Sequence, residues 1–524
     1  MGPVEARPHV FTSDRVPGLW SPVLGAAAAP VTPSPSFRTA APAALALIAA
    51  CTTVGIGSTT TTVAPATTTA PTTTTTIADC SGSYAAAPDS VEGDDTSAIS
   101  VAISQLTFDC AHEAVVTADT MPAIRAGAAL ASGSDVPLLV EGAAVTNELD
   151  RLGVRNVTWV GVAPAPAFGV ETEVVTPSEV AAEPPPPTMG TETIWVLDGD
   201  PDAAPIVEAA ARPRGHGFVD VTGFDDIRTA PTEIIGMLRE AQIVPVAVTD
   251  DRRWQLETVR SAPELPGAGL TFDRKRLVAF YGNPTTGALG VLGEQDPAGT
   301  LERLLPLVDE YSTDGLQGIP TFEIIATVAS ARAGVDDDYS DEASVATLRP
   351  WIDYAAEHGM YVILDLQPGR TDFLTQARLY EELLRLPHVG LALDPEWRLK
   401  PGQVHLRQIG TVDAAEINQV SAWLAGIVRE ERLPQKYFIV HQFRFSMITD
   451  RDLIETPPEL FTVIQMDGQG PLPTKYETYA AITAGQVDVG WSWGWKNFYD
   501  EDSPMATPAQ VLAVEPLVVF VSFQ

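Results

Sequence analysis

The feature that most constrains the fold is a regular alternation of short apolar runs and amphipathic helical patterns through residues 276–524. The apolar runs have the length of buried strands and lie at residues 277–281, 321–328, 361–365, 389–394, 437–442, 460–467, 487–493 and 517–522. Helical patterns lie between most of them, at residues 298–310, 345–358, 373–386, 414–431 and 475–484. Eight strands alternating with helices over about 250 residues are typical of a (β/α)8 barrel. We therefore predict a C-terminal TIM barrel over residues 270–524.

A second α/β pattern precedes the barrel and predicts an N-terminal βαβ-type parallel-sheet domain over residues 80–265. Its first half resembles the cell-wall-binding type 2 repeat of actinobacteria and clostridia. The matching segments are VVTAD at 115–119, AGAALA at 126–131, PLLV at 137–140, ELDRLG at 148–153 and VTWVG at 157–161. The resemblance covers about 50 residues and implies a parallel α/β fold with binding to a cell-wall polymer.

The first 79 residues carry the pattern of an exported, anchored protein. Residues 43–50 are apolar and end in Ile-Ala-Ala before Cys51, which resembles a bacterial lipobox and implies a lipid on Cys51. Residues 1–51 are the predicted signal segment. Residues 1–30 are unlike a signal sequence, and one explanation is a start codon placed too far upstream, with translation beginning at Val31. Residues 52–79 are rich in Thr and predict a disordered stalk.

The composition agrees with a location outside the cell. The chain has 68 acidic and 32 basic residues, a formal net charge of −36, which argues against nucleic acid as a partner. No internal stretch is long and apolar enough for a membrane-spanning helix, so we expect membrane attachment through the lipid alone, on the extracellular face. In an oxidising exterior, Cys80 and Cys110 are the natural disulfide pair.

The strongest candidate for an active site is the run from Gly390 to Trp397, a strand pattern that ends in two carboxylates, Asp394 and Glu396. If strand geometry continues through Pro395, the two carboxylates share a face with the small residues at 390 and 392. The C-terminal ends of barrel strands converge on one face, where TIM barrels keep their chemistry. The other polar residues that we expect there are Asn283, Glu323, Asp365, Gln367, His441, Gln442, Gln465 and Asp467.

The strand ending in Asp394 and Glu396 is similar to the Asp-x-Glu strand of family 18 glycoside hydrolases, and to the Asp-x-Glu of family 25 lysozymes. The resemblance implies that Glu396 is the catalytic acid and that Asp394 is its partner. Asp467 or Asp365 is the expected base or nucleophile in a two-carboxylate scheme. The predicted substrate is an envelope or environmental polysaccharide.

Trp491, Trp493 and Trp495 alternate and would share one face of a strand. Indole packs well on the flat faces of sugar rings, so we expect at least one in a ligand cleft; packing in the barrel is the alternative. The predicted substrate-binding residues are these three tryptophans together with His441, Gln442, Glu323 and Asn283.

Two other functions stay open. The barrel could bind glycan or another wall component without catalysis, or it could be a metal-dependent hydrolase with His441, Asp365, Asp394 and Asp467 as ligands. No zinc motif, nucleophile elbow or phosphate-binding loop is present, and we predict neither a cofactor nor a tight metal site. The acids Asp198, Asp200 and Asp202 follow a strand and are expected to be solvated loop residues.

Overall fold

The computed structural model describes residues 80, 89–180, 192–486 and 489–524. The predicted signal segment, lipidated Cys51 and Thr-rich stalk all lie outside the described residues. Cys80 and Cys110 are joined by a disulfide, which confirms the predicted pair. Among the described residues, no helix is long and apolar enough to cross a membrane.

The region before residue 265 contains two parallel sheets, where the sequence predicted one α/β domain. The first has the order β2-β1-β3-β4, with β2 at Leu138–Val140, β1 at Glu113–Thr117, β3 at Asn156–Val160 and β4 at Glu171–Val175. The second has the order β6-β5-β7, with strands at Gly217–Asp220, Thr193–Leu197 and Gln242–Val246. One apolar core joins residues of both sheets with α1 (Thr96–Thr107), α2 (Met121–Ser134) and α4 (Ala204–Ala211). The remaining helices are α3 (Val145–Leu152), α5 (Thr232–Glu240) and α6 (Asp250–Ser261).

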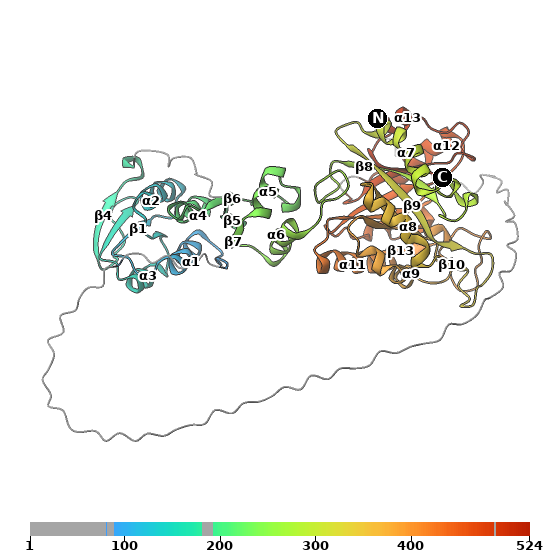
Figure 1. The fold of residues 1–524 in the computed structure, drawn as a ribbon. Helices are drawn as coiled ribbons and strands as arrows, with labels where there is room; N and C mark the ends of the chain where they lie inside the picture. The colour runs from blue at the N-terminus through green and yellow to red at the C-terminus, as the bar shows by residue number, and fades with distance from the viewer. Residues whose placement is uncertain (1–79, 81–88, 181–191, 487–488) are drawn as a thin grey trace, which may run out of the picture. The chain divides into compact units, whose positions relative to one another are not determined.

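Eight parallel strands close into a barrel in the C-terminal part (Figure 1). Their order around the ring follows the chain, and β18 pairs with β8 to close it. The strands are β8 (Lys275–Gly282), β9 (Gln317–Ala329), β11 (Tyr361–Leu366), β12 (Val389–Leu393), β14 (Lys436–His441), β16 (Leu460–Met466), β17 (Ser492–Asn497) and β18 (Val518–Phe523). This confirms the predicted barrel. The seventh strand, however, begins five residues after the start of the predicted run at 487.

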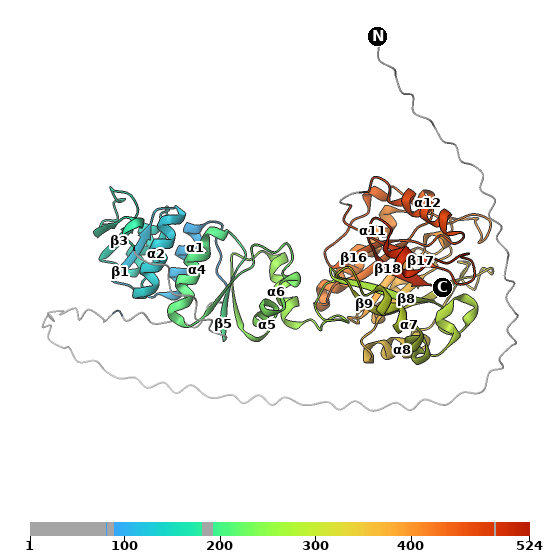
Figure 2. The same cartoon turned by 90° about the horizontal axis from the view of Figure 1, so that it is seen from above.

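Helices lie outside the barrel strands, as Figure 2 shows for α7, α8 and α12. They are α7 (Pro297–Tyr311), α8 (Val345–Glu357), α9 (Phe373–Leu379), α10 (Glu381–Leu384), α11 (Ala414–Glu431), α12 (Leu472–Thr483) and α13 (Pro508–Leu512). Four of them begin after an Asp or Ser whose side chain accepts a hydrogen bond from a backbone N–H of the first turn: Asp296, Ser344, Asp372 and Asp413. These caps satisfy donors that a helix start leaves unpaired, which explains why the predicted helix starts are accurate.

The inward-facing residues of the barrel change from apolar to charged along the strands. An apolar cluster containing Tyr361, Ile363, Ala392, Tyr437 and Ile439 fills the interior, and Phe272 packs edge-on against both tyrosine rings. Two residues further along the chain from Ile363, Ala392 and Ile439, the same face carries Asp365, Asp394 and His441. The barrel is therefore filled by side chains at one end and holds its polar groups at the other.

Gly390 allows β12 to lie close to its neighbours. A Cβ at this position would lie 2.6 Å from the Tyr437 carbonyl oxygen and 3.0 Å from Ile363 Cδ1. We expect Gly390→Ala to lower the free energy of unfolding by about 1–3 kcal/mol, because the backbone contact cannot rotate away. Urea denaturation of the full-length chain measures the change.

The matched control is Gly426→Ala in α11, where an added Cβ meets nothing within 4 Å. Removing a glycine from a helix interior is expected to raise the free energy of unfolding by about 0.5–1 kcal/mol. If Gly390→Ala were as stable as the wild type, close packing at β12 would not explain the glycine.

Candidate active site

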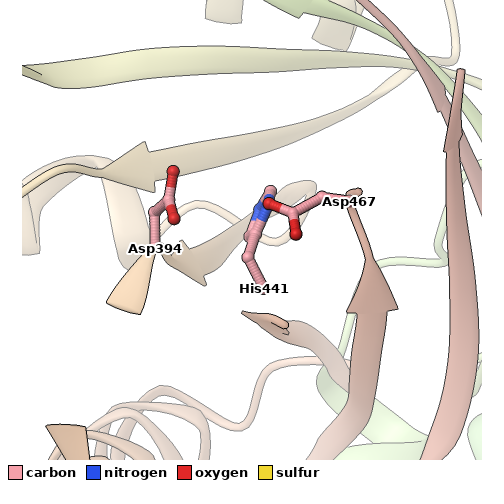
Figure 3. A group of neighbouring side chains, drawn as sticks. All are labelled: Asp394, His441 and Asp467. Atoms are coloured by element: carbon pink, nitrogen blue, oxygen red, sulfur yellow. The ribbon is translucent and has the colours of Figure 1, made fainter. Parts of the chain in front are cut away.

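The acidic residues predicted at strand ends converge around one histidine. Glu323 lies on β9, Asp365 on β11, and His441 is the last residue of β14. Asp394 and Asp467 directly follow β12 and β16. All five side chains are buried, and Figure 3 shows His441 between the carboxylates of Asp394 and Asp467.

Glu396 belongs to the same cluster, but the backbone that carries it has a different conformation from the predicted strand. The strand β12 ends at Leu393, and Pro395–Trp397 form a 3-10 turn, so Asp394 and Glu396 do not share a strand face. Proline favours the start of such a turn because its φ is fixed and it has no N–H to pair. Glu396 is half-buried, whereas the other acids of the cluster are buried, which makes it the most accessible carboxylate of the group.

His441 is held by three carboxylates. Its Nδ1 lies 3.0 Å from Asp467 Oδ2, within hydrogen-bond distance. Its Nε2 lies 3.4 Å from Glu323 Oε1 and 3.7 Å from Asp365 Oδ1. Burial alone would lower the pKa of His441, but the bond to Asp467 and the charges of Glu323 and Asp365 outweigh burial and raise this pKa well above its ordinary value.

Three acids of the cluster have a raised pKa: Asp365, Asp394 and Glu396. Burial raises the pKa of Asp365 to about 6, although the charge of His441 acts in the opposite direction. Burial and the nearby charge of Glu396 raise the pKa of Asp394 well above its ordinary value. Burial and repulsion from Asp467 raise the pKa of Glu396 to about 8, so its carboxyl group keeps a proton at neutral pH.

Two residues of the site were not predicted from the sequence. Tyr281 of β8 donates a hydrogen bond of 2.8 Å to Asp365 Oδ2, and Gln367 Nε2 donates to the Tyr281 hydroxyl. Lys496 of β17 places its Nζ 3.4 Å from the centroid of the Tyr281 ring. The positive charge of Lys496 lowers the pKa of both Asp365 and Glu396 against the effect of burial. Lys496 was missed because the predicted seventh strand ended at Trp493.

The predicted tryptophan platform belongs to the core instead. Trp493 and Trp495 are buried, and their rings pack against Tyr479 of α12, with Tyr476 also on Trp495. Trp491 is buried against Trp493. Trp493 and Trp495 alternate with Lys496 along β17, so their indoles lie on the helix side of the strand, and Lys496 lies on the inner side.

Gln442 and Asn283 have partners in the neighbouring loops. Gln442 Nε2 donates to the carbonyl oxygen of Arg444, and its Oε1 accepts from Arg451 Nη1. Asn283 Oδ1 accepts from the N–H and the hydroxyl of Thr285. These contacts fix the loops after β14 and β8 and involve none of the clustered carboxylates.

Among the residues that the structure describes, two groups of side chains have the residue types of a metal site. The first consists of Asp394, His441 and Asp467, whose potential ligand atoms lie within 4.8 Å of one another. The second consists of Asp336, Asp338 and Glu342, of which only Asp338 is buried. Asp338 accepts hydrogen bonds from Ser340 N and Thr371 Oγ1, so its carboxylate already has protein partners.

Comparison of the chain with protein-family models, with curated proteins and with solved structures gave no match. The closed barrel and the geometry of its polar end are the features that bear on function.

Proposed function

We propose that the barrel is a glycoside hydrolase that acts on an envelope or environmental polysaccharide. The observation that carries the proposal is the convergence of five carboxylates from four strands, or from the residues directly after them, in one closed barrel: Glu323, Asp365, Asp394, Glu396 and Asp467. Most glycosidases cleave with a pair of carboxyl groups, one as acid and one as nucleophile or base.

Glu396 is the proposed general acid because it is the least buried of the five carboxylates. A proton donor must reach the oxygen of the leaving sugar, and an accessible carboxyl group is the best placed to do so. Asp394 and Asp467 flank His441 and form a separate group with it, so Asp365 of β11 is the proposed partner carboxylate.

A surface location fits the same substrate class. The lipobox-like Cys51 and the repeat-like segment at 115–161 are expected to keep the protein on the cell envelope, where polysaccharide is abundant. Lipid attachment and wall binding remain part of the proposal.

The proposal is tested by incubating the full-length chain with a panel of polysaccharides that includes peptidoglycan and chitin oligomers. New reducing ends that increase with time and protein concentration are the expected result. Co-sedimentation of the protein with an insoluble glycan from which no reducing ends appear would contradict hydrolysis and favour a binding protein.

A further inference from the structure

We propose that Asp394, His441 and Asp467 hold one divalent transition-metal ion, and that the ion binds hydroxyl groups of the sugar. The second part rests on the proposed glycosidase function, whereas the first part stands on the structure of the site alone. The three residues come from the ends of β12, β14 and β16, which are neighbours in the barrel.

The spacing of the three side chains suits a single ion. One ligand atom from each lies within 4.8 Å of the others. Zinc binds imidazole nitrogen and carboxylate oxygen at about 2.0–2.2 Å, so two ligands of one ion lie at most about 4.4 Å apart. Rotation of an aspartate side chain about its χ angles can bring ligand atoms from 4.8 Å to this shorter separation without any movement of the strand ends.

Unpartnered ligand atoms are the second observation. Asp394 Oδ1 and Asp467 Oδ1 are buried, and neither has a hydrogen-bond partner among the described residues. The same is true of both oxygens of Glu323 and of Asp365 Oδ1. Buried polar atoms are normally paired, and leaving one unpaired costs about 1–3 kcal/mol. All five of these atoms are carboxylate oxygens, so the partner they lack is a cation or a hydrogen-bond donor, and not another acceptor.

The surroundings of His441 orient it as a ligand. Nδ1 lies 3.0 Å from Asp467 Oδ2, so Nδ1 is the ring nitrogen on the side of the proposed ion, which would take the place of this hydrogen bond. A carboxylate on the second ring nitrogen is the usual support of a metal-bound histidine. Glu323 Oε1 and Asp365 Oδ1 lie 3.4 and 3.7 Å from Nε2, so they are the carboxylates that would hold this second ring nitrogen.

The ligand types select the class of metal. Calcium and magnesium prefer all-oxygen sites, whereas imidazole favours zinc and other first-row transition metals. With one nitrogen and several carboxylate oxygens, Zn²⁺ or Mn²⁺ is the expected ion. Positions on the ion that the protein leaves open accept hydroxyl oxygens, which would orient the sugar ring beside Glu396.

The test uses the full-length chain, treated with a chelator, dialysed and titrated with Zn²⁺ and with Mn²⁺ in a calorimeter. We expect Asp394→Asn and Asp467→Asn each to weaken binding of the preferred ion by at least about 100-fold, since each removes a charged ligand. Both changes keep the side-chain size, and circular dichroism checks the fold. The matched control is Asp336→Asn, in the second acidic group, which should bind the ion as the wild type does.

Unchanged binding in both site variants, or loss of binding in Asp336→Asn alone, would overturn the metal site. The substrate part is tested separately with whichever glycan the wild type hydrolyses. Equal hydrolysis by the metal-free and metal-loaded protein would overturn the role of the ion in sugar binding. Ion binding that depends on Asp394 and Asp467, in a protein that hydrolyses no glycan, would support the metal site and contradict the proposed function.

Discussion

Replacement of Glu396 by glutamine is expected to lower kcat on a susceptible glycan by about 10²–10⁴-fold, the contribution of a general acid. Glutamine keeps the size of the side chain but has no proton to give to the leaving oxygen. KM should change little, because glutamine has the size of glutamate and still offers a hydrogen-bond acceptor and a donor to the bound glycan. Initial rates of reducing-end release over a range of glycan concentrations separate the two constants.

The control for this experiment is Glu357→Gln, an exposed residue at the end of α8 that carries the same chemical change away from the polar end of the barrel. It should hydrolyse glycan at the wild-type rate. A Glu396→Gln protein that keeps more than about a tenth of the wild-type kcat would exclude Glu396 as the acid and direct attention to Asp394 or Asp467.

The second large effect is expected on stability. Trp495→Ala should lower the free energy of unfolding by about 3–5 kcal/mol, because it empties a large volume between β17 and α12. Trp495 is fully buried, packs on Tyr476 and Tyr479, and donates from Nε1 to Asn497 Oδ1. Chemical denaturation monitored by far-ultraviolet circular dichroism measures the change.

Phe445→Ala is the comparison for Trp495, because Phe445 is a large aromatic residue that is 57% exposed in the loop after β14. Its loss should change the free energy of unfolding by no more than about 0.5 kcal/mol. If Trp495→Ala instead abolished glycan binding and left stability unchanged, the indole would be a ligand platform, as the sequence alone suggested.

The barrel was predictable because its strands carry a strong local signal. Seven of the eight strands lie within a few residues of their predicted positions, since each is an apolar run bounded by polar residues and buried on both faces. The seventh strand was misplaced because Trp491, Trp493 and Trp495 make the alternation equally good before and after the true start at Ser492. Only pairing with β16 and β18 decides that register.

The acids of the site were also predictable, since barrel topology brings strand ends together whatever the loops do. The contacts between them were not. The role of Tyr281 depends on its distance from Asp365, across β9, which no local pattern reports. The turn after β12 follows from Pro395, a signal that was present in the sequence but was read as a continuing strand. The two sheets before residue 265 could not be distinguished from one, because strand patterns do not state which strands pair.

The change from apolar to charged residues along the barrel interior has a consequence for protein engineering. The apolar residues that fill one end of the barrel stabilise it. The buried acids with unpaired oxygens at the polar end destabilise the barrel, because they repel one another and have lost their hydration. A selection for heat resistance would therefore favour uncharged replacements of Glu323 or Asp394, and the most robust variants recovered would be those that had lost the chemistry of the site.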